Sequence, residues 1–136
     1  MTQRIPLERH RAPVGQLGQT VPRAENPEAI GAMVSVVIDG IETKVPFGST
    51  ILEAAESVGV RIPTLCNHPD LDMAGVCRIC VVEVEGQRTL QAACAYPITT
   101  SITVNTHTRA VRVARRHVLD LLLSEHYGDC YTCVRN

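Results

Sequence analysis

The sequence predicts an α+β fold of the β-grasp type for most of this 136-residue chain. Three observations favour this fold: two β-rich runs joined by a tight-turn dipeptide, a short capped helix directly after them, and a second strand pair followed by one more strand. The resulting order is hairpin, helix, irregular segment, hairpin and strand. That order is typical of a β-grasp domain.

A hairpin and a helix make up the first half of the predicted domain. Asp39-Gly40, a dipeptide typical of tight turns, separates the β-rich runs VSVVID and IETKVP. Thr50 and Glu53 then form a capping-box pattern for a helix over 51–58, and Gly59 ends that helix. We expect the apolar core to consist of Val, Ile, Leu and Ala, because the chain has no Trp and one Phe.

The second half begins with an irregular segment over 61–80, which Pro and Gly interrupt. Strands are then expected over 80–86 and 88–94, separated by a turn at Gly86-Gln87, and over 101–105. Each of these runs alternates or is rich in β-branched residues. Together they supply the second strand pair and the last strand of the predicted sheet.

A long helix is expected to follow, from a cap at Thr106 to about Glu125. Apolar residues recur at helical spacing along one face, namely Val111, Ala114, Val118, Leu119 and Leu122. We interpret the basic residues of the same helix as a solvated face, formed by Arg109, Arg112, Arg115 and Arg116.

Charge and composition exclude several function classes. The net charge is −1, and the segment 34–104 has four basic residues against eight acidic ones, so we expect no nucleic-acid partner. No stretch approaches the roughly 20 apolar residues of a transmembrane helix, and the first thirty residues lack the apolar core of a signal peptide. We therefore expect no direct membrane insertion. Six cysteines without an export signal indicate a reducing compartment, and we expect a cytoplasmic protein.

The cysteines carry most of the functional information. Cys66, Cys77, Cys80 and Cys94 have the spacing C-x10-C-x2-C-x13-C, with three in the irregular segment and the fourth at the end of the next hairpin. Thiolates are soft ligands, and four of them on such a scaffold favour a 2Fe–2S cluster. An irregular segment also leaves backbone N–H groups free to face the sulfur atoms. This pattern predicts a carrier of single electrons.

A second, incomplete ligand set lies near the C-terminus. His126, Cys130 and Cys133 have the spacing His-x3-Cys-x2-Cys, just past the end of the predicted helix. Two interpretations remain open from the residues alone. The three side chains are either part of the ligand set of a 4Fe–4S cluster, which normally needs four, or a surface histidine beside a structural or zinc-binding thiol pair.

Zinc is the main alternative to iron and sulfide. The C-x2-C pairs that begin at Cys77 and Cys130 are a usual zinc-binding pattern, but 49 residues separate them, far more than a zinc ribbon uses. A zinc site of this kind would also leave Cys66 and Cys94 without a role. Disulfides are a further alternative, but nothing in the sequence indicates export.

The residues around the cysteines resemble a known family. The run GVCRICVVEVEG, with LCNHPDL before it and ACAYPITTSITVNT after it, resembles the N-terminal 2Fe–2S ferredoxin-like region of several oxidoreductases. These are the large iron–sulfur subunit of respiratory complex I, NAD(P)-linked and di-iron hydrogenases, and NAD-dependent formate dehydrogenases. The resemblance covers about 34–136. It departs from plant-type ferredoxins, whose first cysteine gap is x4 instead of x10.

The resemblance implies a 2Fe–2S cluster on Cys66, Cys77, Cys80 and Cys94. It also implies a 4Fe–4S cluster in the full-length protein, because a His-x3-Cys-x2-Cys-x5-Cys set follows the helix in this family. His126, Cys130 and Cys133 match its first three ligands. The fourth would fall near position 139, so the sequence is interpreted as truncated. The predicted domains are a 2Fe–2S ferredoxin-like domain over 33–106 and a helix with a partial His/Cys segment over 107–136, after a flexible leader over 1–32 that four prolines and the lack of periodicity indicate.

Our functional prediction is an electron-transfer module of a multisubunit oxidoreductase of the hydrogenase, NADH dehydrogenase or formate dehydrogenase type. Its expected partners are flavin- or hydrogen-cluster-bearing subunits or domains. The sequence has no nucleotide-binding fingerprint, general base or nucleophile, so we expect no catalysis by this chain alone. The alternative is a zinc-binding β-grasp protein with a structural or interaction role.

Overall fold

The structure is a computed structural model that describes residues 31–68, 70–126, 128 and 130–134. Within these ranges, five strands form one mixed sheet and two helices accompany it, which is the predicted α+β, β-grasp arrangement. The predicted leader over 1–32 lies outside the described residues up to position 30. The elements are β1 (Met33–Ile38), β2 (Ile41–Pro46), α1 (Ile51–Ser57), β3 (Val81–Val84), β4 (Gln91–Ala92), β5 (Ile102–Asn105) and α2 (Arg109–Ser124).

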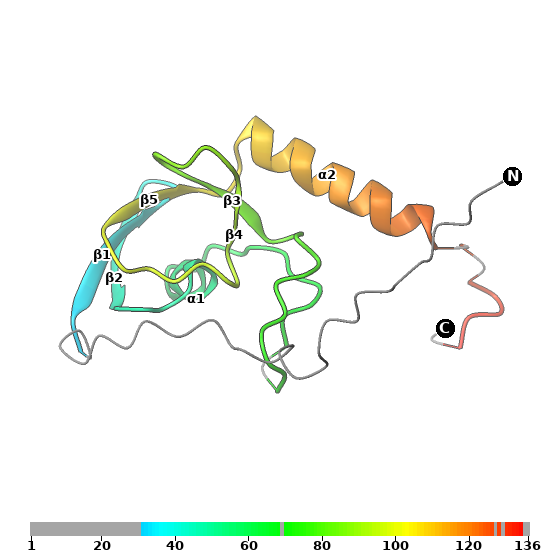
Figure 1. Cartoon of the computed structure of the whole chain (residues 1–136), viewed down its shortest axis with the longest axis horizontal. Helices are drawn as coiled ribbons and strands as arrows, with labels where there is room; N and C mark the ends of the chain where they lie inside the picture. Colours follow the sequence, from blue (N-terminus) through cyan, green and yellow to red (C-terminus); the bar gives the residue numbers. More distant parts are fainter. Residues whose placement is uncertain (1–30, 69, 127, 129, 135–136) are drawn as a thin grey trace, which may run out of the picture.

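The strand order in the sheet is β2-β1-β5-β3-β4 (Figure 1). β1 and β2 form the predicted antiparallel hairpin, whose turn residues Asp39 and Gly40 both have positive φ, at 48° and 86°. Such a turn favours Asp or Asn followed by Gly. β5 lies parallel to β1 and antiparallel to β3. β5, which comes late in the sequence, is therefore the central strand and joins the β1–β2 hairpin to β3 and β4.

β4 is much shorter than the strand predicted over 88–94. It has only two residues, because a turn closed by the 3.0 Å hydrogen bond from Ala95 N to the Ala92 carbonyl follows it directly. Cys94 lies inside this turn. Because β4 ends at Ala92, Cys94 lies in the turn and not in a strand of the sheet.

α1 has the capping box that the sequence predicts. The Glu53 amide donates to the Thr50 hydroxyl, and the Glu53 carboxylate accepts from the Thr50 amide. The amides at the start of α1 also bind the segment around Cys94, because Leu52 N donates to the Ala93 carbonyl at 3.0 Å and Ile51 N donates to the Tyr96 carbonyl at 3.2 Å. Amides in the first turn of a helix have no partner inside the helix. Here they fix the backbone on both sides of Cys94.

The core lies between the sheet and α1, which the curved sheet encloses (Figure 1). As predicted, it consists almost entirely of aliphatic side chains. The largest fully buried ones among them are Ile38, Ile51, Ile98, Val36, Val82, Val84 and Val104. Cys80 and Cys94 belong to the same buried cluster. Two of the six thiols are therefore core residues.

α2 begins later than predicted. Its N-cap is Thr108, whose hydroxyl accepts a hydrogen bond from Val111 N, and the predicted cap at Thr106 is wrong. Thr106 is fully buried and bonds Asp39 instead, which leaves Thr108 to cap the helix. The predicted apolar stripe is only partly buried: Val111 is inaccessible, whereas Leu119 and Leu122 are exposed.

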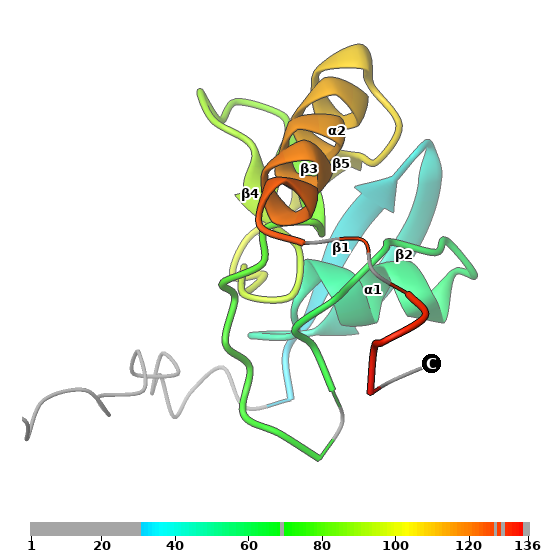
Figure 2. The same ribbon diagram turned by 90° about the vertical axis from the view of Figure 1, so that its right-hand side faces the viewer.

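α2 starts over β3 and then extends away from the sheet (Figures 1 and 2). Neither this helix nor any other in the described part of the chain is long and apolar enough to cross a membrane.

Candidate metal centre

Cys80 and Cys94 form the buried half of the candidate site. Cys80 directly precedes β3, and Cys94 lies in the turn after β4. The hydrogen bond from Ala93 N to the Cys80 carbonyl (3.2 Å) holds the two backbones together, and the two Sγ atoms are 3.4 Å apart. Both side chains are almost inaccessible, with 1% and 3% exposure. Strand pairing and core packing therefore fix this thiol pair.

Cys66 and Cys77 form the more open half. Both lie in the irregular segment between α1 and β3, and both are partly buried. Burial acts to raise the pKa of Cys77, but hydrogen bonds from the Ile79 backbone and from the side chain and backbone of Cys66 lower this pKa below its ordinary value. The backbone of Leu65 contributes in the same direction. The irregular segment thus directs backbone N–H groups at a sulfur atom, which favours the thiolate.

The four sulfur atoms lie close enough to affect one another. Burial, the neighbouring Cys80 thiol and the negative charges of Cys80, Cys66 and Cys77 raise the pKa of Cys94 to about 12. Four thiolates held close together repel one another, and burial removes part of their hydration. A positively charged iron centre removes both costs, because thiolates are its ligands. The donor set is therefore of the kind that fits a cluster with four cysteine ligands.

The arrangement is one of two pairs. Among the described residues, no group of three or more His, Cys, Asp or Glu side chains is arranged to hold a single metal ion. The Sγ atoms of Cys80 and Cys94 are in contact, and the side chain of Cys66 contributes to the lowered pKa of Cys77. A zinc site would need four ligands around one ion, whereas a two-iron centre needs two thiolates for each iron. Two thiol pairs supply the number of ligands that a two-iron centre needs.

Two backbone conformations shape the segment that carries the cysteines. Gly75 has φ +61°, and a Cβ atom at this position would lie 3.4 Å from Ala95 Cβ, beside Cys94. Arg78, between Cys77 and Cys80, also has a left-handed φ, at 59°. For a residue with a side chain this conformation costs about 1–2 kcal/mol. The strain at Arg78 lies between Cys77 and Cys80, and stored backbone strain is common at functional sites.

The C-terminal set has a different environment. Cys130 and Cys133 are exposed, and His126 Nδ1 accepts a hydrogen bond from Gly128 N at 3.0 Å. Cys130 N donates to the Gly128 carbonyl at 3.0 Å. The described residues do not bring His126 and these two cysteines together as a three-ligand site.

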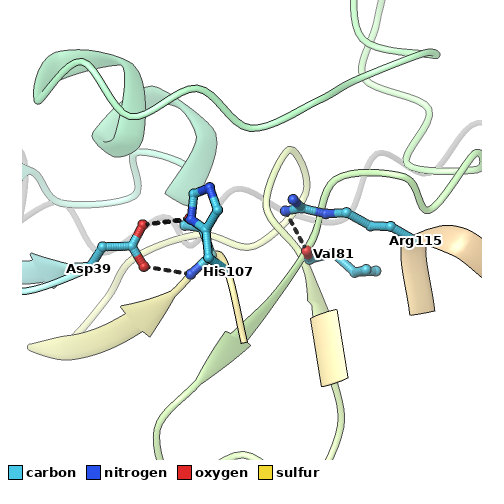
Figure 3. Close-up of polar contacts among 5 residues, drawn as sticks. Asp39, Val81, His107 and Arg115 are labelled. Carbon is cyan, nitrogen blue, oxygen red and sulfur yellow. Dashed lines mark hydrogen bonds and ion pairs between the residues drawn. The ribbon is translucent and has the colours of Figure 1, made fainter. Parts of the chain in front are cut away.

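Two polar contacts are absent from the sequence-based predictions, and the second of them adjoins Cys80 (Figure 3). The Asp39 carboxylate accepts from Thr106 N at 2.7 Å and from the Thr106 hydroxyl, and His107 Nδ1 lies 3.3 Å from the same carboxylate. Arg115 is half-buried and donates to the Val81 carbonyl at 2.9 Å, so its assignment to a solvated face is wrong. The sequence contains a signal for this partial burial, because Arg115 comes four residues after the buried Val111 and so lies on the same helix face.

Comparisons with known proteins concern the same region of the chain. Residues 31–109 match the family described as a 2Fe-2S iron-sulfur cluster binding domain. The NADP-reducing hydrogenase subunit HndD of Solidesulfovibrio fructosivorans is 48% identical over 110 residues, and the match covers 77% of this chain and 19% of HndD. The 75 kDa subunit of the NADH-ubiquinone oxidoreductase of Reclinomonas americana is 44% identical over 101 residues, with 74% and 15% covered. The chain thus spans less than a fifth of either relative.

A solved structure shares the fold as well. The crystal structure of an NAD+-reducing NiFe-hydrogenase in the H2-reduced state contains a chain with a TM-score of 0.64 and 36% sequence identity. The match covers 77% of this chain and 44% of the hydrogenase chain. At this identity the similarity extends beyond fold alone to the sequence of the domain.

Proposed function

The chain belongs to the family of 2Fe-2S iron-sulfur cluster binding domains, and on this premise we propose that it is an electron-transfer module of a multisubunit oxidoreductase. The observation that supports the proposal is the contact of the Cys80 and Cys94 Sγ atoms, 3.4 Å apart, where the charges of Cys66 and Cys77 also act on Cys94. When bound there, a 2Fe–2S cluster supplies a site that takes up and releases single electrons.

The protein would contribute ligands, charge balance and rigidity. Cys80 and Cys94 would ligate one iron from the core, where strand pairing and the α1 amides fix the backbone around Cys94. Cys66 and Cys77 would ligate the other iron, and the amides near Cys77 would stabilise negative charge on sulfur. A rigid ligand shell of this kind keeps the rearrangement on electron transfer small.

Electrons would enter and leave on the side of the irregular segment. That segment lies away from β1 and β2 at the other end of the sheet (Figure 1). It exposes several large apolar side chains next to the cysteines, namely Leu65, Leu71, Met73 and Val76. The opposite side of the candidate site is filled by the core. A redox partner would therefore approach over the segment that bears Cys66 and Cys77.

Partners and location follow from the same proposal. We propose flavin- or hydrogen-cluster-bearing subunits or domains as partners, because subunits of a hydrogenase and of an NADH-ubiquinone oxidoreductase are relatives of this chain. The cytoplasm is the proposed location, since all six thiols are free and cluster ligation requires reduced cysteine. We keep 33–106 as the 2Fe–2S domain and assign His126, Cys130 and Cys133 to a 4Fe–4S cluster of the full-length protein.

Anaerobic purification followed by metal, sulfide and absorption analysis tests the proposal. Two irons and two acid-labile sulfides for each chain, with visible bands that dithionite bleaches, are the expected result. One zinc ion in a colourless protein would contradict it and would support the zinc-binding alternative. An additional four irons in this chain would show that the C-terminal set assembles a second cluster.

A further inference from the structure

Arg115 is the one basic side chain of α2 that hydrogen-bonds a residue of the sheet in the described structure. Its guanidinium extends from the helix to the backbone of β3, where Nη2 donates to the Val81 carbonyl at 2.9 Å (Figure 3). Val81 directly follows the proposed ligand Cys80. The positive charge is therefore held next to the buried half of the candidate site by a bond to main chain.

The surroundings of this guanidinium are unusual for a surface arginine. Its Nε atom is buried and has no hydrogen-bond partner among the described residues. Burial lowers the pKa of Arg115, while the negative charges of Cys80 and Asp39 act to raise it. Arginine nevertheless remains protonated at any physiological pH. The chain thus keeps an incompletely bonded cation beside a proposed ligand, at a cost in desolvation.

We propose that Arg115 is a positioning residue for the redox centre, whose fixed positive charge beside Cys80 raises the reduction potential of a 2Fe–2S cluster held by the four cysteines. This inference rests on the proposed function. Two ferric ions, two sulfides and four thiolates sum to a charge of −2, and reduction makes it −3. Arg115 interacts more strongly with the reduced state, because the Coulomb energy grows with the charge of the partner.

The position of Arg115 decides the size of the effect. A half-buried cation is screened much less than one in water, so one added electron nearby changes the reduction equilibrium constant by about tenfold. For a one-electron couple, a tenfold change corresponds to about 59 mV. Arg116, the next residue on α2, carries the same charge but is 83% exposed and lies 4.0 Å from Asp120. Its contribution to the potential is expected to be small and removed by salt.

The test is a redox titration of the cluster-loaded protein, followed by its electron paramagnetic resonance signal. Dithionite supplies one electron, which reduces one ferric ion to ferrous and forms or breaks no bond. The variants are Arg115→Gln, Arg115→Met and Arg115→Lys, with Arg116→Gln as the matched control for net charge. Metal and sulfide analysis of the wild type first establishes the cluster, so failure at that step overturns the proposed function and leaves no centre for Arg115 to act on.

With the cluster present, Arg115→Gln and Arg115→Met should reduce the equilibrium constant for reduction about tenfold. With Arg115→Lys this equilibrium constant should stay close to the wild-type value. Arg116→Gln should change it less than twofold. Equal values for the wild type and both neutral variants would overturn the inference, as would an equal change in the Arg116 control. Arg115→Gln can keep a hydrogen bond to Val81, whereas Arg115→Met cannot. If only Arg115→Met changes the potential, the effect comes from the hydrogen bond and not from the charge, and the inference is overturned.

Assembly provides a second criterion in case the neutral variants do not retain the cluster. Circular dichroism then compares the folded, metal-free chains. Rescue of assembly by Arg115→Lys in chains that are equally folded would support an action of the charge on the centre. Failure of all three Arg115 variants would show that Arg115 only packs α2 against β3.

Discussion

Thr106 is the residue for which the structure makes the sharpest stability prediction. Its buried hydroxyl donates to the Asp39 carboxylate, which connects the β1–β2 turn to the segment before α2. Thr106→Val keeps the shape and the Thr106 amide bond but removes this hydroxyl. A hydrogen bond to a charged group contributes about 1.5–3 kcal/mol. Because the Asp39 side chain is 26% exposed, we expect a loss near the lower end, about 1.5 kcal/mol of unfolding free energy.

The loss should depend on pH with a definite sign. Burial acts to raise the pKa of Asp39, but hydrogen bonds from the Thr106 side chain and backbone, with a contribution from His107, lower it below its usual value of 3.8. A lowered folded pKa means that the bond stabilises the fold fully above about pH 4 and loses its effect as the pH falls through the folded pKa. The difference between wild type and Thr106→Val should therefore be constant above about pH 5 and narrow below about pH 4.

Urea unfolding of the reduced, metal-free chain, followed by circular dichroism, measures this difference. In thermal unfolding, 1.5 kcal/mol corresponds to about 6–12 °C for a domain of this size. Ser35→Ala is the matched control, because Ser35 also donates to a carboxylate, that of Glu42 at 2.9 Å, but at the surface. It should cost less than about 0.5 kcal/mol. An equal cost for both variants, or a Thr106→Val difference that persists unchanged at pH 3, would refute the reasoning.

Three further predictions concern the centre and its support. Cys80→Ser should abolish the visible 2Fe–2S spectrum of the purified protein, whereas Cys130→Ser should leave it intact; loss of the spectrum in the Cys130 variant would mean that the ligands are grouped wrongly. Gly75→Ala forces a left-handed conformation on a residue with a side chain, at about 1–2 kcal/mol, and should accelerate cluster loss in chelator, measured by absorbance. Thr50→Ala removes the α1 cap and should cost about 1 kcal/mol in urea unfolding, without any pH dependence near pH 4.

Local signals in the sequence predict much of the fold. The Asp39-Gly40 turn and the Thr50–Glu53 capping box lie where the sequence places them, because each depends on residues close in sequence. The predicted limits of β4 and α2 are less accurate. The turn at Cys94 shortens β4, and Asp39, 67 residues away, takes Thr106 from the helix cap. Both errors arise from contacts between distant parts of the chain, which a local pattern does not contain.

The sequence likewise predicts only part of the candidate site. The spacing of the four cysteines is sufficient to group them, but their division into a buried pair and a more open pair depends on tertiary packing. Four arginines on the helix suggest a charged face, and this pattern wrongly places Arg115 in solvent. Its contact with Val81 requires the angle at which α2 crosses β3, and this angle is a property of the folded chain.

The 3.4 Å separation of Cys80 and Cys94 has a practical consequence for anyone who prepares this protein. Two thiols in contact need only a small movement to become cystine, and an oxidant that removes two electrons from them would leave neither able to ligate metal. Air exposure after chelation would thus trap the polypeptide in a form that iron cannot reconstitute. A reductant such as dithiothreitol, added before iron and sulfide, should recover it.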